Sequence, residues 1–506
     1  MHEQQRGKII LVGAGPGDAG LLTIKGAEAI EKADTVVFDN LVGNGVLARI
    51  PSTAEAIYVG KISGNHSMQQ TDITALLRQK ALEGKRVVRL KGGDPFLFGR
   101  GGEEVEGLLS EGIEFEVIPG VTSAFSVPAY AGIPVTHRDF CSSVHIVTAH
   151  SRNAPADGIN FESLASSGGT MIFLMGVEAL SSICAGLLQA GMPPETPAAI
   201  IEQGTLANQR RVVSTLAKLP AASKAAEIKP PAITVVGKVC QLSDEMAWRE
   251  RQPLFGVKIT LTRPADRGSR LAKLLSSAGA EVISLPAIST EPLNEEPRLD
   301  DTVAALNNGD WIAFTSPVGV KLFFEKLNSY HVDVRSLANI HFAAIGQATQ
   351  TEITKRGITC DFTPEVYSAE ELGKGLVKAM QSQPGTTVLL PRSKIGTDNI
   401  LKPLQEAQIR YHDLPIYDTS RPCGAGGKIY EVLTKDALDW VAFTSESTVA
   451  GFAEIVGPER LKGVRALCIG EQTEQAAKGR GMETYTAKQA TLESMVACLI
   501  ETVGRT

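Results

Sequence analysis

The chain has 506 residues, of which 43% are hydrophobic and 21% charged, and its formal net charge is −6. A chain of this length is too long for one ordinary hydrophobic core, so we expect roughly two to four domains. The acidic balance argues against a nucleic-acid-binding protein, which usually carries a basic excess. It leaves open an anionic small-molecule substrate, for which basic residues need only gather in clefts.

The start of the chain and its cysteines indicate a cytosolic protein. We find no export-signal pattern at the start and no apolar run near the roughly 20 residues that span a membrane. The 7 cysteines stand singly without a CxxC motif, which is typical of reduced core thiols rather than disulfides or zinc ligands. His145 and His150 lie on one predicted strand but point to opposite faces, so we predict no metal site.

Short apolar runs alternate with amphipathic stretches along the whole chain. This pattern predicts an α/β protein, in which helices cover sheets. A charged segment with Pro253, residues 246–255, interrupts the pattern and predicts a linker between two halves. In chain order, the predicted strands lie within residues 8–15, 34–40, 86–93, 170–177, 232–239, 258–264, 310–316, 386–393, 439–445 and 466–470.

The second half contains an internal repeat. Trp311 and Trp440 are the second residues of the matching segments DWIAFTSPVGV and DWVAFTSESTV, which are 129 residues apart. The same spacing separates Pro286 of LPAIST from Pro415 of LPIYDT, and Arg263 of TLTRP from Arg392 of VLLPR. Solenoid repeats are about 20–50 residues long, so this longer spacing indicates duplication of a whole α/β unit.

The first predicted strand ends in GAGPGD, which raises the question of a dinucleotide-binding turn. That turn requires G-x-G-x-x-G, but Gly13, Gly15 and Gly17 give G-x-G-x-G, and Asp18 stands at the third required position. Its carboxylate would repel a phosphate at the N-terminus of the next helix. These residues leave two interpretations: a turn approached closely by a ligand without phosphate, or a tight turn that binds nothing.

Three further segments of the first half carry a resemblance to a known family. They are VVRLKGGDPFLFGRGGEE (87–104), VIPGVTSAFSVPAYAGIPVTHRD (117–139) and TMIFLMGV (170–177). Together with GAGPGD, they closely resemble the uroporphyrinogen-III C-methyltransferases of the tetrapyrrole methylase family. The resemblance covers residues 1–245 and implies a two-lobed α/β fold that differs from the Rossmann-like methyltransferase fold. It also implies the cofactor S-adenosyl-L-methionine, folded in the cleft between the lobes.

The resemblance assigns residues to the cofactor as well. Glycines suit such a site because they let backbone N–H and C=O groups approach a ligand closely, and a carboxylate suits a sulfonium or an amino group. For Met175 considered alone, packing in the core is an alternative. Matched motif by motif, the cofactor-binding residues would be Pro16, Gly92, Gly93, Asp94, Leu97, Thr122, Ser123, Met175, Ala199 and Ala232.

Asp39 follows an apolar strand, at the end where ligands bind in α/β folds. The family places its candidate base here, because methylation of a pyrrole carbon generates a cationic ring and a carboxylate can take the proton that must leave. Lys61 matches a family lysine near the substrate. Arg89, Lys91 and Arg138 are either partners of substrate carboxylates or solvated surface charges.

The duplicated half, considered alone, shows no nucleophile, metal cluster or phosphate loop. Its segments DWIAFTSPVGV, HFAAIGQAT, LPIYDT and TAKQATLESM resemble the uroporphyrinogen-III synthases. The resemblance covers residues 256–506 and implies two α/β lobes joined by two strands: lobe one from 256–287 plus 418–506, and lobe two from 288–415. Synthases of this family close linear hydroxymethylbilane with inversion of the last ring, and mainly hold one geometry of a reactive substrate.

The candidate residues of this half are one tyrosine and several hydroxyl side chains. Tyr417 matches a family tyrosine proposed to help hydroxide leave, and packing of the connecting strand is its alternative role. Glu446 stands where the family often has proline, as Pro317 does in the first repeat. The hydroxyls expected to bond acetate and propionate groups of the substrate are Thr315, Ser316, Thr444, Ser445 and Thr491.

The two halves fit one pathway, because a synthase makes uroporphyrinogen III and a C-methyltransferase consumes it. We expect a bifunctional enzyme that converts hydroxymethylbilane to uroporphyrinogen III and then, by methylation at C2 and C7, to precorrin-2, which leads to sirohaem and cobalamin. We also expect a homodimer through the first half, and no nucleic-acid or membrane partner.

Three alternatives remain. The second half could be a non-catalytic tetrapyrrole-binding module. The chain could bind S-adenosylmethionine without turnover, as a sensor or interaction protein. It could also methylate a later corrin intermediate, although the complete KGGDPFLFGRGGEE segment favours the early substrate.

Overall fold

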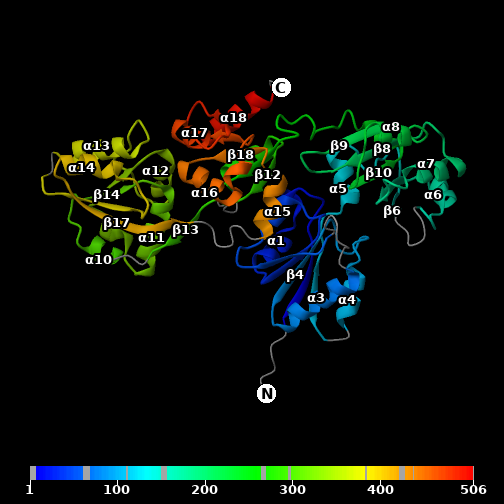
Figure 1. Ribbon diagram of the computed structural model, residues 1–506, viewed down its shortest axis with the longest axis horizontal. Coiled ribbons are helices and arrows are strands. Elements are labelled where there is room, and N and C mark those ends of the chain that lie inside the picture. The colour runs from blue at the N-terminus through cyan, green and yellow to red at the C-terminus, as the bar shows by residue number, and fades with distance from the viewer. Residues whose placement is uncertain are drawn as a thin grey trace, which may run out of the picture. The chain divides into compact units, whose positions relative to one another are not determined.

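The computed structural model describes residues 7–60, 69–109, 112–149, 156–263, 269–293, 298–381, 384–420, 428–436 and 438–504. The chain forms two compact units: unit 1 consists of residues 1–287 and 422–506, and unit 2 of residues 288–421. Within the described residues, unit 1 contains three five-stranded sheets and unit 2 contains one. Figure 1 follows their elements along the chain.

The first sheet of unit 1 is parallel throughout, in the order β3-β2-β4-β1-β5. Strand β1 carries a continuous apolar run without exposed surface, as expected where helices cover both faces. Buried residues of α1 and α2 lie on one face, and those of α3 and α4 on the other. The elements are β1 (Lys8–Gly13), η1 (Ala19–Leu21), α1 (Ile24–Glu31), β2 (Thr35–Phe38), α2 (Asn44–Leu47), β3 (Glu55–Tyr58), α3 (Gln70–Leu82), β4 (Arg86–Lys91), α4 (Gly101–Leu109) and β5 (Glu114–Ile118).

The second sheet of unit 1 is mixed, in the order β6-β7-β10-β8-β9, and β10 is antiparallel to both neighbours. Together with the first sheet, it confirms the predicted two-lobed α/β fold of the first half. The elements are α5 (Ser123–Tyr130), β6 (Val144–Thr148), α6 (Phe161–Ser167), β7 (Thr170–Leu174), α7 (Leu180–Gln189), β8 (Pro197–Glu202), β9 (Arg210–Thr215), α8 (Leu219–Ala225), β10 (Ala232–Val236) and η2 (Lys238–Leu242).

The third sheet of unit 1 belongs to the duplicated half and is parallel, in the order β12-β11-β18-β19-β20. Its first two strands precede unit 2 in the sequence and the other three follow it, so this sheet is built from two separate segments. The elements are β11 (Lys258–Leu261), α9 (Arg270–Ser277), β12 (Glu281–Ser284), α15 (Lys428–Asp436), β18 (Trp440–Phe443), α16 (Glu446–Val456), η5 (Pro458–Arg460), β19 (Arg465–Cys468), α17 (Glu471–Lys478), β20 (Glu483–Thr486) and α18 (Leu492–Val503).

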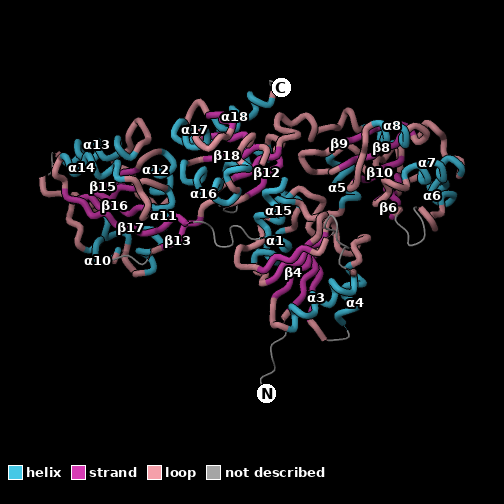
Figure 2. Tube along the Cα trace, viewed as in Figure 1, coloured by secondary structure: helices cyan, strands magenta, loops and turns pink. Residues whose placement is uncertain are grey.

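Unit 2 has one sheet in the order β13-β17-β16-β14-β15, in which only the β13–β17 pair is antiparallel. Figure 2 shows this sheet with α13 and α14 on one side and α10 and α11 on the other, and the buried side chains agree. The elements are β13 (Ser289–Pro292), α10 (Leu299–Ala304), β14 (Trp311–Phe314), α11 (Pro317–Ser329), η3 (Val334–Leu337), β15 (His341–Ala344), α12 (Gln347–Thr354), α13 (Ala369–Met380), β16 (Thr387–Ser393), η4 (Asp398–Ile400), α14 (Leu401–Glu406) and β17 (Arg410–Ser420).

The internal repeat is visible in the core of each copy. Phe314 and Phe323 meet edge to face with ring centroids 5.3 Å apart, and the equivalent pair, Phe443 and Phe452, does so at 5.5 Å. Each pair joins a strand to the helix that follows it, and such contacts contribute about 0.5–1.5 kcal/mol beyond burial. The duplicated α/β fold predicted for the second half is therefore confirmed.

The segment predicted as a linker packs against both halves. Trp248 donates a hydrogen bond from Nε1 to the carbonyl O of Ala129 at 2.9 Å and meets the Tyr130 ring edge to face. Leu254, in contrast, is completely buried in the cluster of β11 and α9, so the end of the segment packs against the second half. Residues 246–255 therefore form part of unit 1, while the predicted domain boundaries themselves stay predictions.

Candidate functional sites

Three glycines bring the first turn of the chain against two neighbouring loops. A Cβ added to Gly13 would lie 2.4 Å from the backbone N of Gly120, and one added to Gly120 would lie 2.2 Å from the carbonyl O of Gly93. Gly93 has φ +68°, a conformation that favours glycine. The three loops thus approach one another more closely than Cβ atoms would allow. Such close backbone packing fits a cofactor held by backbone N–H and C=O groups.

Asp18 is engaged in the glycine turn itself. Its Oδ1 accepts the Gly20 N–H at 2.7 Å, and its Oδ2 accepts the Tyr130 hydroxyl at 2.8 Å. Burial, followed by the Asp18 charge, raises the pKa of Tyr130, so this hydroxyl keeps its proton and donates it. A carboxylate caps the helix start where a dinucleotide phosphate would bind, which disfavours the dinucleotide interpretation.

Met175 occupies an exposed and strained position just after β7. Its φ is +55° and 53% of its surface is exposed, so the alternative of core packing is wrong. Such backbone conformations cost of order 1–3 kcal/mol and cluster at ligand sites. Ala199 of β8, in contrast, is completely buried, and Ala232 at the start of β10 is partly buried. Among these three, Met175 has the side chain most accessible to a ligand.

The polar cofactor candidates bond to backbone N–H groups of their own and neighbouring loops. Asp94 accepts the Phe96 N–H through Oδ1 at 2.8 Å and the Gly120 N–H through Oδ2 at 3.0 Å. Thr122 Oγ1 caps α5 by accepting the Ala124 N–H at 3.2 Å. Both side chains therefore fix the loops around the glycine turn. The other candidates of these loops are partly buried: Pro16, Gly92, Leu97 and Ser123.

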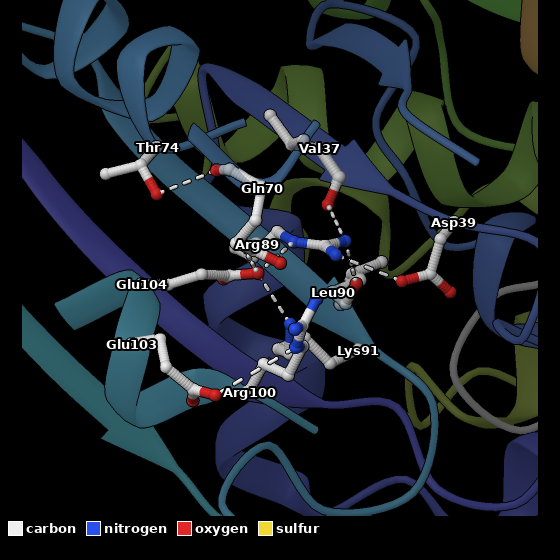
Figure 3. A network of polar contacts seen from close by, with 10 residues as sticks. All are labelled: Val37, Asp39, Gln70, Thr74, Arg89, Leu90, Lys91, Arg100, Glu103 and Glu104. Carbon is white, nitrogen blue, oxygen red and sulfur yellow. Dashed lines mark hydrogen bonds and ion pairs between the residues drawn. The ribbon is translucent and has the colours of Figure 1, made fainter. Parts of the chain in front are cut away.

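Asp39 lies one residue beyond the end of β2 and forms an ion pair (Figure 3). Arg89 Nη2 is 3.0 Å from its Oδ2, and the Leu41 N–H donates to Oδ1 at 3.1 Å. The Asp39 side chain remains 20% exposed. Since each carboxylate oxygen has two lone pairs, each keeps one acceptor position beyond these bonds. The side chain is thus held in place and still accessible.

Arg89 and Lys91 are neither exposed partners for a substrate nor solvated surface charges. Both are buried, and both side chains turn to acids: Arg89 to Asp39, and Lys91 Nζ to Glu104 Oε1 at 2.6 Å. Arg89 Nη1 also donates to the Leu90 carbonyl at 2.7 Å. Their predicted contact with substrate carboxylates therefore has no support from these positions and stays a prediction.

Sequence reasoning missed Glu104, which has no exposed surface. Its position on α4 carried a signal: it lies three residues after Gly101 and four before Leu108, on the stripe that faces the sheet. A carboxylate on a buried stripe requires a cationic partner. The neighbouring Glu103 is exposed and faces Arg100 instead.

The remaining candidates of the first half are Lys61 and Arg138. Lys61 lies outside the described residues, and Arg138 is exposed. Within the part of the chain that the structure describes, no group of three or more histidine, cysteine, aspartate or glutamate side chains could hold a metal ion. None of the described helices is long and apolar enough to cross a bilayer.

In unit 2, Ser316 and Tyr417 form a hydroxyl pair. Ser316 ends the loop after β14 and caps α11, with its Oγ accepting the Gly319 N–H at 2.9 Å. The same Oγ shares a hydrogen bond with the Tyr417 hydroxyl at 2.8 Å. Tyr417 is 6% exposed and belongs to the buried cluster of this unit, so it also contributes to packing of the connecting strand. Thr315 is partly buried beside this pair.

In unit 1, the equivalent loop after β18 is built differently. Ser445 makes no side-chain cap to α16, and its Oγ shares a hydrogen bond with Ser447 Oγ at 3.0 Å. The Thr444 Oγ1 is buried and has no hydrogen-bond partner among the described residues. Thr491 is exposed and caps α18 through the Ser494 N–H at 3.2 Å. The structure thus brings Thr444 and Ser445 together, but places Thr491 at a separate helix start.

Two family models match separate parts of the chain. The family described as Tetrapyrrole (Corrin/Porphyrin) Methylases matches residues 8–220, and that described as Uroporphyrinogen-III synthase HemD matches residues 269–497. Their order agrees with the two resemblances found in the sequence.

Individual proteins match one or both halves. The porphyrin biosynthesis protein HemD of Ruminiclostridium josui is 42% identical over 500 residues, which is 99% of each chain. The S-adenosyl-L-methionine-dependent uroporphyrinogen III methyltransferase of Methanosarcina barkeri is 52% identical over 47% of this chain and 94% of its own. A crystal structure of the Thermus thermophilus uroporphyrin-III C-methyl transferase with S-adenyl homocysteine is 38% identical over 46% of this chain and 99% of its own, with a TM-score of 0.41. With a full-length relative and both family models, the chain belongs to the proteins that fuse a tetrapyrrole methylase to a uroporphyrinogen-III synthase of the HemD family.

Proposed function

We propose that the chain is a bifunctional enzyme of tetrapyrrole biosynthesis. Residues 256–506 cyclise hydroxymethylbilane to uroporphyrinogen III with inversion of the last ring. Residues 1–245 then methylate this product at C2 and C7 with S-adenosylmethionine, which gives precorrin-2, the precursor of sirohaem and cobalamin. The observation that carries the proposal is the 42% identity, along the whole chain, to a porphyrin biosynthesis protein, together with the two family matches.

Asp39 is the base of the methylation in this proposal. Bound S-adenosylmethionine supplies an electrophilic methyl group. Asp39 accepts the proton that the methylated ring carbon must lose, at a carboxylate oxygen that keeps a free acceptor position. Its support is the accessible side chain at the end of β2, held by Arg89. The loops of Gly13, Gly93 and Gly120, with Met175, would hold the cofactor.

Neutral groups carry the ring closure in this proposal. The Tyr417 hydroxyl assists hydroxide as it leaves, and Ser316 orients it through their shared hydrogen bond. Thr444 and Ser445 bind carboxylate arms of the substrate. The unpartnered Thr444 hydroxyl supports this role, because a buried donor without a partner costs free energy until a ligand satisfies it.

One anaerobic incubation tests both activities. The purified protein receives hydroxymethylbilane with and without S-adenosylmethionine, and the oxidised products are separated by chromatography with mass detection. We expect type III uroporphyrin without the cofactor and a dimethylated product with it. If only the type I isomer forms, the second half is no synthase. If type III forms but is never methylated, the first half is no methyltransferase acting on it.

We further propose a cytosolic homodimer that associates through the first half. Six cysteines of the described residues are free thiols. Burial raises the pKa of Cys184 to about 11 and that of Cys468 to about 12, so both stay protonated and unreactive at neutral pH. Light scattering on the full chain and on residues 1–245 checks the dimer: both should have twice the monomer mass.

A further inference from the structure

Three buried ionisable side chains, Arg89, Lys91 and Glu104, lie in series behind Asp39 (Figure 3). Arg89 holds Asp39, and Glu104 Oε1 lies 3.6 Å from Arg89 Nε and 2.6 Å from Lys91 Nζ. The side chains of Arg89, Lys91 and Glu104 are 4%, 7% and 0% exposed. Desolvation of each ion costs several kcal/mol, so a buried ion pair is a weak argument for stability. This arrangement therefore calls for a functional explanation.

Sheet geometry places these three groups and Asp39 in sequence. Arg89 and Lys91 are two residues apart on β4 and point to the same face. Arg89 lies in register with Val37 of β2, which brings its guanidinium beside Asp39 just beyond that strand. Helix α4 covers this face and brings Glu104 against both cations.

Glu104 counters the repulsion between the two cations. Its Oε1 accepts from Lys91 and, at 3.0 Å, from Gln70 Nε2, whereas its Oε2 is buried and has no hydrogen-bond partner in the part of the chain that the structure describes. Within the described ranges, the Arg89 Nε also lacks a hydrogen-bond partner. Burial lowers the pKa of Lys91, the Arg89 charge lowers it further, and Glu104 raises it. Without Glu104, the Nε side of the Arg89 guanidinium would face only the positive charge of Lys91.

We propose that Glu104 is a positioning residue for methyl transfer: it fixes the Arg89 guanidinium, which in turn orients the Asp39 carboxylate. The inference rests on the proposed role of Asp39 as the base. Since Glu104 acts through Arg89 alone, its loss should slow the reaction without weakening substrate binding, because small misplacements of a reacting group lower the rate strongly.

The first test compares two matched substitutions on α4. Glu104→Gln removes the buried charge and keeps the shape, whereas Glu106→Gln makes the same change at an exposed position. We expect Glu104→Gln to lower the single-turnover rate of methyl transfer about 10- to 100-fold, with the KM for uroporphyrinogen III changed less than about threefold. Glu106→Gln should leave both within about twofold.

A double-mutant cycle shows whether the effect passes through Asp39. In the Asp39→Asn background, Glu104→Gln should lower the rate by less than about threefold. An equal loss in both backgrounds, or a raised KM at unchanged kcat, would overturn the inference. If Asp39→Asn slows methyl transfer but Glu104→Gln keeps the wild-type rate, the inference on Glu104 is also overturned. If Asp39→Asn itself keeps the wild-type rate, the proposed role of Asp39 is overturned instead.

A second variant keeps the test valid if Glu104→Gln does not fold. Lys91→Met combined with Glu104→Leu removes both charges and refills the space, a replacement that buried ion pairs often tolerate. Thermal unfolding should show a folded protein whose methyl-transfer rate is still at least about tenfold low. A wild-type rate in this folded variant would overturn the inference.

Discussion

The two halves of the chain build their candidate sites from different chemical groups. In the first half, a carboxylate at the end of β2 is held by an arginine, and that arginine by a second, buried pair of charges. In the second half, the loop after β14 presents a serine hydroxyl that bonds the hydroxyl of Tyr417. Both sites follow parallel strands, but one depends on fixed charges and the other on neutral hydrogen bonds.

The difference follows the chemistry that we propose for each half. Methylation of a ring carbon leaves a proton that a base must accept, so a carboxylate has to be kept charged and oriented. Hydroxymethylbilane cyclises unaided, so its enzyme mainly selects one geometry. Neutral hydroxyls are sufficient for that task, and they avoid the cost of burying charges.

Asp39→Asn should have the largest effect, and it should affect the activity of the first half only. It removes the base from the first half and leaves the hydroxyls of the second half unchanged. We expect methyl transfer to fall about 10²- to 10⁴-fold, and the rate of type III ring closure to stay within about twofold. Both rates can be measured on one protein preparation. A parallel loss of the two activities would contradict the role of Asp39 as a base for methylation only.

Tyr417→Phe should produce the reverse pattern with a smaller effect. The hydroxyl bonded to Ser316 is lost while the ring still fills its place in the core. We expect ring closure to slow about tenfold, the effect of losing one hydrogen bond at a reacting group, and methylation of supplied uroporphyrinogen III to be unchanged. Tyr411→Phe on the same strand is the control. If ring closure proceeds at equal rates in the two variants, Tyr417 contributes to packing only.

Ser316→Ala and Ser445→Ala should have different effects on the stability of the two repeats. Ser316 caps α11, whereas Ser445 makes no cap to α16. We expect the free energy of local opening at the start of α11 to fall by about 1 kcal/mol with Ser316→Ala, and that of α16 to change by less than about 0.5 kcal/mol with Ser445→Ala. Amide hydrogen exchange at the starts of α11 and α16 measures the two free energies of local opening. Equal changes in the two variants would contradict the difference in capping.

Thr444→Val should have the smallest effect on stability. It replaces a buried hydroxyl without a hydrogen-bond partner by a methyl group of similar size. We expect the free energy of unfolding to stay within about 0.5 kcal/mol or to rise, since an unsatisfied group is removed. Ring closure should nevertheless slow a few-fold if the hydroxyl bonds the substrate. A clear loss of stability, seen by thermal unfolding, would show that Thr444 has a partner in the folded protein.

Much of the fold could be predicted from local patterns. The apolar run of β1 predicted a strand of a helix-covered sheet, and the spacing of Trp311 and Trp440 predicted the duplication. A strand's burial pattern is contained in consecutive residues, and the duplication is recognised by matching short segments along the chain. The resemblances then supplied the arrangement of lobes, which periodicity alone does not determine.

The ionic partners at the site could not be predicted in this way. Arg89 and Lys91 were expected to meet substrate carboxylates or solvent, yet they meet Asp39 and Glu104. Those acids come from the end of a neighbouring strand and from a later helix, and only the folded sheet brings them together. Asp39 could be named as a candidate because its place at a strand end is a local signal, and its role as a base stays a proposal.

Unit 2 also affects the order in which the chain can fold during synthesis. Ile259 of β11 pairs with Trp440 of β18, so this sheet has a very high contact order. A ribosome adding about 5–20 residues per second needs about 10–35 s to make the intervening segment. Unit 2 is continuous in sequence and can fold during this interval. Until β18 has been synthesised, the apolar edge of β11 has no strand to pair with. Joining residue 287 directly to residue 422 would remove most of that delay, and this sheet should then fold faster.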